Sequence, residues 1–79
     1  MFNQKVEAVL EDVQQVSIHG QRYYDVRFRV DSTDAGGVRK ARAPFEEVYS
    51  NPKPGDEVII HALLGTVTKI EKQENEGAS

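Results

Sequence analysis

The stretch RYYDVRFRV, residues 22–30, alternates between two kinds of side chain along its whole length. One set of alternate positions is apolar and the other is mostly charged: Tyr24, Val26, Phe28 and Val30 against Tyr23, Asp25, Arg27 and Arg29. Successive side chains of a strand point to opposite faces, so this period predicts a half-buried β-strand with a charged outer face. The other strands of the fold are the segments that can pair with residues 22–30.

Turn-forming residues separate this strand from further β-rich segments. HGQ at 19–21 stands between VQQVSI and the strand, which is a hairpin signal. VRKARA at 38–43 follows the turn-rich DSTDAGG at 31–37 and predicts a third strand. EVIIHALLGTVTKIEK at 57–72 predicts two more strands, joined about Leu64 and Gly65.

The N-terminal residues 2–16 fit two patterns. Apolar residues recur there at helical spacing, while Val6, Ala8 and Leu10 also alternate as in a strand. The hairpin needs a strand before its turn, so we expect β-structure for residues 5–18. An N-terminal helix, which would make the fold α+β, is the alternative.

Two shorter segments complete the chain. PFEEVYSNPKPGDE at 44–57 starts with a proline and has acids in its first turn, so we expect a short helical element near residues 45–50. QENEGAS at 73–79 has no apolar residue to bury and is predicted to be disordered. Residues 1–72 therefore form one domain.

Five strands with a helical element after the third predict an all-β fold, a small closed or nearly closed barrel. This order resembles the oligonucleotide/oligosaccharide-binding (OB) barrel, and an SH3-like barrel would give nearly the same order. The OB resemblance implies a binding surface on the second and third strands.

Composition excludes several classes of function. The 79-residue chain has no cysteine, which removes disulfides, thiolate metal ligands and a cysteine nucleophile. His19 and His61 have no second ligand at metal spacing, and no catalytic motif is present, so we expect neither a metal, a cofactor nor an enzyme. The longest apolar run, VIIHALL at 58–64, is too short to span a bilayer, and the N-terminus lacks a signal-peptide layout. We expect a cytoplasmic protein with no membrane partner.

The net charge of −3 is unevenly distributed. Residues 22–42 carry six basic side chains against three acidic ones, so this segment is positive and the rest of the chain is strongly negative. If the apolar positions of the second strand face inward together with Ala41, Ala43 and Phe45, then Arg29 lies opposite Lys40. Arg27 then lies opposite Arg42. Such a square of four cations needs local neutralisation or an anionic partner.

The first strand offers neutralisation. A bulge at Gln14 and Gln15 would turn both Val13 and Val16 inward and would bring Asp12 beside Arg29. Glu7 or Glu11 is also expected close to these basic residues. The outer face would then be a solvated, mixed-charge surface. The alternative is a site for single-stranded nucleic acid. Its basic side chains would follow the phosphates and its one ring would stack on a base; the residues are Tyr23, Arg27, Arg29, Lys40 and Arg42.

Two other features favour a protein partner. The NPKPG loop at 51–55 serves as a chain reversal or, alternatively, presents Tyr49 and Lys53 to another protein. The apolar strand that contains Ile59 and Leu63 has scarcely a polar face, so it is either central in the sheet or pairs with another subunit. We therefore expect a non-catalytic module for protein interaction or self-association as a homodimer, with single-stranded nucleic acid as the alternative partner.

Overall fold

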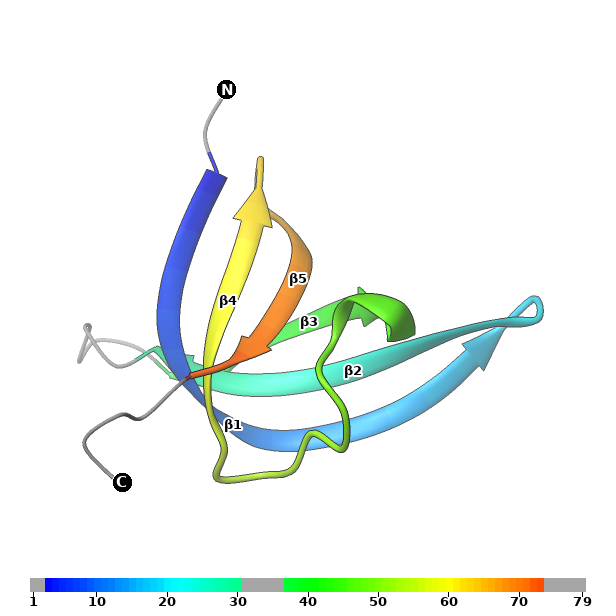
Figure 1. The fold of residues 1–79 in the computed structure, drawn as a ribbon, viewed down its shortest axis with the longest axis horizontal. Helices are drawn as coiled ribbons and strands as arrows, with labels where there is room; N and C mark the ends of the chain where they lie inside the picture. The colour runs from blue at the N-terminus through cyan, green and yellow to red at the C-terminus, as the bar shows by residue number, and fades with distance from the viewer. Residues whose placement is uncertain (1–2, 31–36, 74–79) are drawn as a thin grey trace.

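The computed structural model describes residues 3–30 and 37–73, which form five antiparallel strands and one 3₁₀ turn (Figure 1). In chain order these are β1 (Asn3–Ile18), β2 (Gln21–Val30), β3 (Arg39–Pro44), η1 (Phe45–Glu47), β4 (Glu57–Leu63) and β5 (Thr66–Lys72). The prediction of an all-β fold is confirmed, and the N-terminal helix is wrong. The expected helical element is reduced to the single turn η1.

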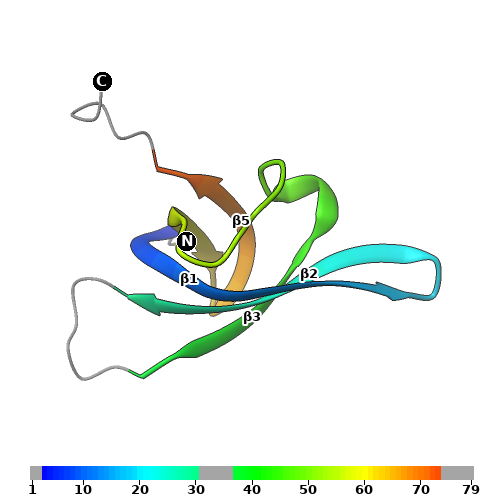
Figure 2. The same cartoon turned by 90° about the horizontal axis from the view of Figure 1, so that it is seen from below.

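The strands form one sheet in the order β3-β2-β1-β4-β5. Three strands joined by successive reversals, with a fourth that returns beside the first, make a Greek key. Among the described residues no ladder joins β3 to β5, so the sheet is not closed, although these two strands contact each other. In Figure 2, β1, β2 and β3 lie together across the molecule and β5 stands on one side of them.

Apolar side chains of every strand meet inside the curl of the sheet. The alternation of residues 22–30 is confirmed, since Val26, Phe28 and Val30 are buried while Arg27 and Arg29 are exposed. The buried core residues among those described are Ala8, Leu10, Val26, Phe28, Val30, Ala43, Val58, Ile60 and Ile70. The β1–β2 turn has two residues, His19 and Gly20, both with positive φ (52° and 80°), the conformation that a two-residue hairpin requires.

A bulge in β1 lies elsewhere than predicted. The register with β2 shifts between Leu10 and Asp12, which makes Glu11 the extra residue. A bulge at Gln14 and Gln15 is therefore wrong: Val13 packs against the core, but Val16 lies on the outer face opposite Tyr23.

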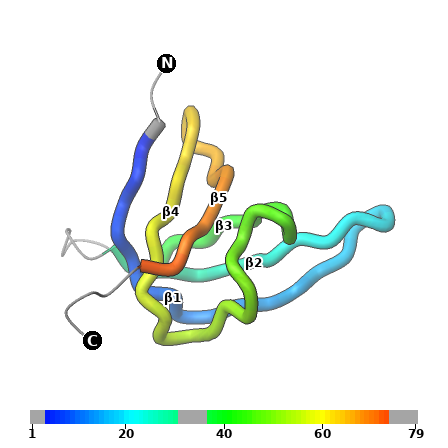
Figure 3. The backbone as a smooth tube through the Cα atoms, viewed as in Figure 1, coloured from blue at the N-terminus to red at the C-terminus, as the bar shows by residue number. Residues whose placement is uncertain are grey.

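The bulge at Glu11 lies where β1 changes its pairing partner. β1 pairs with β4 from Asn3 to Val9 and with β2 from Ala8 to Ile18, so it changes its main partner just before this point. A bulge bends a strand and increases its twist. Figure 3 shows β1 bending here between its two partners, which lets one strand serve both halves of the sheet.

The register between β2 and β3 also differs from the prediction. Arg27 lies opposite Lys40 and Asp25 opposite Arg42, so the predicted pairs of Arg29 with Lys40 and Arg27 with Arg42 are wrong. The shift is two residues, which leaves every side chain on its predicted face. Phe45 does not join the third strand. It begins η1, and its ring stacks on Tyr24 with 5.1 Å between centroids.

The apolar fourth strand is central. β1 occupies one edge of β4 and β5 the other, so pairing of β4 with another subunit along its edge is wrong. Gln73, the first residue of the tail that was predicted to be disordered, donates its N–H to the Glu57 carbonyl at 2.9 Å. The rest of that tail, and residues 31–36 of the predicted turn, lie outside the described residues.

Candidate functional site

Each arginine of the outer face on β2 and β3 has an acidic neighbour. Arg42 donates two hydrogen bonds to the carboxylate of Asp25, at 2.6 and 2.9 Å, and this contact lowers the pKa of Asp25 below its ordinary value. Arg29 donates to Glu11 at 3.1 Å. These pairs are exposed, so each contributes little stability, but they neutralise much of the positive face.

Asp12 has a different partner from the predicted one. Asp12 is opposite Arg27, at 3.9 Å between charged atoms, and is not the partner of Arg29. The bulged residue Glu11 takes that place. Neutralisation by β1 is therefore present, through Asp12 and through Glu11, which was expected close to these basic residues.

One like-charge pair remains. Arg27 and Lys40 are directly opposite each other, and Lys40 has no carboxylate within ion-pair distance among residues 3–30 and 37–73. They line an open groove of about 490 Å³ across the outer face of β1, β2 and β3. The complete lining is Asp12, Gln14, Asp25, Val26, Arg27, Lys40, Ala41 and Arg42.

The aromatic member of the predicted nucleic-acid site lies beyond the groove lining. Tyr23 is half-buried, with the Arg42 guanidinium 6.0 Å from its ring centroid. Its hydroxyl donates to the Gln21 side chain at 3.1 Å. The structure thus brings Arg27, Lys40 and Arg42 together, with Tyr23 beside Arg42 at the end of this surface.

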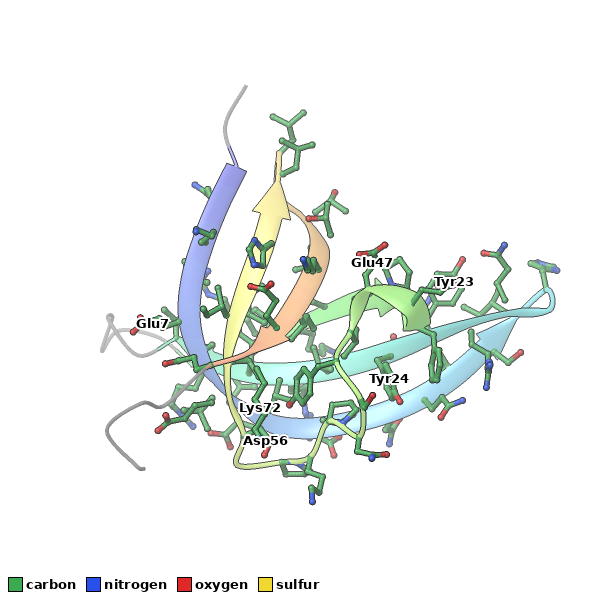
Figure 4. All side chains as sticks on the ribbon, viewed as in Figure 1. Glu7, Tyr23, Tyr24, Glu47, Asp56 and Lys72 are labelled. Atoms are coloured by element: carbon green, nitrogen blue, oxygen red, sulfur yellow. The ribbon has the colours of Figure 1, made fainter. Side chains whose placement is uncertain are left out.

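The loop residues predicted for protein contact are held by internal bonds. The half-buried Tyr49 hydroxyl donates to Asp56 at 2.7 Å, and the Lys53 N–H donates to the same carboxylate oxygen at 3.1 Å. Burial, and then the neighbouring carboxylate, raise the pKa of Tyr49. Figure 4 shows Asp56 and Lys72 close to each other beneath β4 and β5. The Lys53 side chain is exposed, whereas the Tyr49 hydroxyl is already hydrogen-bonded to Asp56.

Ile59 and Leu63 lie on the outer face of β4, partly buried. Ile59 has Glu7 of β1 on one side and Glu71 of β5 on the other, so this face is mixed in character rather than apolar. His61 contacts Glu71 at 2.8 Å on the same face, and this bond, with that from Lys69, lowers the pKa of Glu71. Leu64, in the turn that joins β4 to β5, has an exposed apolar side chain.

The free edge of β1 is a feature that the sequence interpretation missed. Pairing with β4 ends at Val9, and the backbone of Leu10 is bonded to Gly55 and Asp56 of the loop. From Val13 to Ile18 β2 covers one edge, and no other strand among the described residues covers the second. We call residues 13–18 along this uncovered side the β1 free edge.

The backbone groups that point from the β1 free edge follow from the turn. Ile18 and Gln21 flank a two-residue turn and so form a hydrogen-bonded pair. Antiparallel strands alternate hydrogen-bonded and non-hydrogen-bonded pairs, which directs the N–H and C=O of Val13, Gln15 and Ser17 away from β2. The sequence signal for this site was the uncharged run VQQVSI, but only the length of the turn fixes which of its residues point outward.

The described residues contain no group of three or more metal-ligating side chains, and no helix among them is long and apolar enough to cross a membrane. Comparison of the chain with protein-family models, curated proteins and solved structures finds no match.

Proposed function

We propose that this protein is a non-catalytic binding module that takes an extended segment of a protein partner as an added strand on the β1 free edge. The observation that supports it is a strand edge with its backbone groups of Val13, Gln15 and Ser17 directed outward. An added strand binds mainly through such main-chain groups, and its alternate side chains give specificity.

The β3 edge and the β1 free edge differ in their protection, while the edge of β5 is partly covered by Val48 and Tyr49, which bridge to Ile70. β3 is short, carries Arg39, Lys40 and Arg42, and ends at Pro44. Charged side chains and proline are the devices that keep an edge strand from pairing with another chain. The β1 free edge has neither, since residues 13–18 are uncharged and contain no proline. This contrast supports β1 as the edge that receives a partner.

We further propose that the fold is an OB-like barrel left partly open rather than an SH3-like one. The OB barrel is a five-stranded, partly open Greek key, and this description fits the observed strand order with β3 and β5 in contact but not paired. In such a fold the face of the second and third strands is a second candidate surface.

An NMR titration tests the proposed strand addition. With a short peptide of alternating valine and threonine, we expect amide shifts at Val13, Gln15 and Ser17 that exceed those at Gln14, Val16 and Ile18. The second set bonds to β2 and serves as the control within the same strand. Shifts of equal size in both sets, or no shifts at high peptide concentration, would contradict strand addition.

A second candidate function rests on the groove. Arg27 and Lys40 face each other there, and a like-charge pair is destabilising unless an anion lies between the two charges. Single-stranded nucleic acid supplies such anions, and Tyr23 lies beside this surface for stacking. The acids Asp12 and Asp25 of the same groove weaken the field, so this function ranks below strand addition.

Charge reversal tests this candidate. If the groove binds a mixed-sequence oligonucleotide, Arg27→Glu with Lys40→Glu should weaken binding about tenfold or more at low salt, because two phosphate contacts become repulsive. Lys5→Glu with Lys69→Glu makes the same change in net charge on the β1–β4–β5 face and should leave binding nearly unchanged. Fluorescence anisotropy at two salt concentrations gives the measurement, and equal loss in both double mutants would refute a groove site.

A further inference from the structure

We propose that the strand added to the β1 free edge is the β1 free edge of a second copy of this chain, in an antiparallel pair with its twofold axis at Gln15. This inference rests on the proposed function and names its partner. It is carried by the pattern of backbone groups along the edge and by the distribution of charge around it.

The backbone pattern is self-complementary. An antiparallel pair requires residues whose N–H and C=O both face the partner, and these recur at every second position. Val13, Gln15 and Ser17 are spaced in this way, symmetrically about Gln15. With the axis at Gln15, Gln15 pairs with its own counterpart, and Val13 of each copy pairs with Ser17 of the other. Every outward backbone group of the edge then has a partner.

The charges agree with the same arrangement. The edge begins after Glu11 and Asp12 and ends at His19 and Gly20, with only uncharged residues between them. Antiparallel pairing brings the acidic end of each strand next to the His19 end of the other copy. A parallel arrangement would place like ends together, and like charges across a sheet are destabilising. The antiparallel twofold is also the symmetry in which one patch can serve both copies.

Space for a second copy is present. The distal part of the β1–β2 hairpin projects from the body of the molecule, well away from β4 and β5, in both Figure 1 and Figure 2. The tip residues are exposed, as are Gln14, Gln15 and Ser17. A sheet continued across two hairpins would leave the groove on the outer face of β2 and β3 uncovered by the new strand pair.

Cysteine cross-linking tests the register. The chain has no native cysteine, so each introduced thiol reports on its own position. Hydrogen-bonded antiparallel residues are about 5.5 Å apart at Cα, within the range of a disulfide. We expect Gln15→Cys to form a covalent dimer under mild oxidation, and Ser50→Cys, exposed in the loop after η1, to remain monomeric. Equal cross-linking of both variants would overturn the proposed register.

Sedimentation equilibrium over a wide range of concentration tests the dimer itself. Gln15→Pro removes an N–H that bonds to nothing within the described part of the protomer, so the variant protomer should still fold. Because the partner strand loses a hydrogen-bond donor, the dimer dissociation constant should rise about tenfold or more. Gln15→Lys places two like charges opposite each other at the axis and should act in the same direction without any change to the backbone. A wild-type dimer that both variants leave intact would exclude this edge as the interface.

The titration with the valine–threonine peptide separates the two proposals. If the wild-type chain stays monomeric at all concentrations while the peptide shifts Val13, Gln15 and Ser17, the edge receives a strand but its partner is not a second copy. If the chain is monomeric and the peptide shifts nothing, strand addition itself is wrong.

Discussion

Leu10→Ala is expected to lower the free energy of unfolding by about 3 kcal/mol, because it removes a large buried side chain and leaves a cavity that the sheet fills only in part. Leu10 is 1% exposed and lies opposite Phe28, where β1 passes from β4 to β2. Its backbone also bonds to Gly55 and Asp56, which limits how far the strand can move to fill the cavity. Urea denaturation followed by circular dichroism measures the change.

Leu64→Ala is the matched control. It deletes the same atoms from a side chain that is 81% exposed, so the expected change is within about 0.5 kcal/mol. A small domain is stable by only about 5 to 15 kcal/mol in total, so the Leu10 variant should be unfolded at a clearly lower urea concentration. If the two variants had the same midpoint, Leu10 would not be part of the core that the structure assigns to it.

The strand alternation in residues 22–30 was sufficient to predict the faces of β2 but not its partners. Period-two patterning determines which side chains are buried, and a two-residue slip preserves it. The sequence interpretation therefore placed Arg27 and Arg29 on the correct face, yet assigned them the wrong neighbours. In the observed register β3 ends at Pro44, and Phe45 leaves the strand to stack on Tyr24. That contact is tertiary, and no local pattern announces it.

The position of the β1 bulge also could not be predicted from local sequence patterning. Val13 and Val16 are both apolar, which favoured a bulge between them, but Val16 lies on the outer face opposite Tyr23. The bulge occurs at Glu11 because β1 must bend there between β4 and β2, and that need arises from the topology of the whole sheet. The sequence pattern was sufficient to place the charged residues of β2 and β3 on one face, while the ion pairs that neutralise them and the β1 free edge depend on the bulge and the turn.

Asp56→Ala is expected to destabilise the protein by about 2 kcal/mol, because it leaves a half-buried tyrosine hydroxyl without an acceptor. Asp56 accepts from Tyr49 at 2.7 Å and from the Lys53 N–H at 3.1 Å, so one carboxylate joins the segment before the NPKPG loop to the middle of that loop. The same loop bonds to Leu10 through the Gly55 N–H and the Asp56 carbonyl, at 2.7 and 2.9 Å. Loss of the carboxylate should therefore loosen the loop where it contacts the bend of β1.

The protonation of Asp56 should make the stability of the wild-type protein depend on pH. The hydrogen bond from Tyr49, followed by that from the Lys53 backbone, lowers the pKa of Asp56 below its ordinary value of 3.8. A carboxyl with a depressed folded-state pKa stabilises the fold above its unfolded pKa, and that stability is lost as the pH falls through the folded pKa. Wild type should thus lose stability below about pH 4 more steeply than Asp56→Asn, which has no proton to gain. Asp25 and Glu71 titrate in both proteins, so the difference between the two curves reports Asp56 alone.

Tyr49→Phe completes a double-mutant cycle, since it removes the hydroxyl and keeps the ring packed against the core. If the hydroxyl and the carboxylate act as one unit, Tyr49→Phe with Asp56→Ala should be less destabilising than the sum of the single changes, by about 1 kcal/mol. Strict additivity would mean that Asp56 holds the loop through the Lys53 backbone alone. In that case the NPKPG segment would be an ordinary turn, and the burial of Tyr49 rather than its bond would keep the loop against β1.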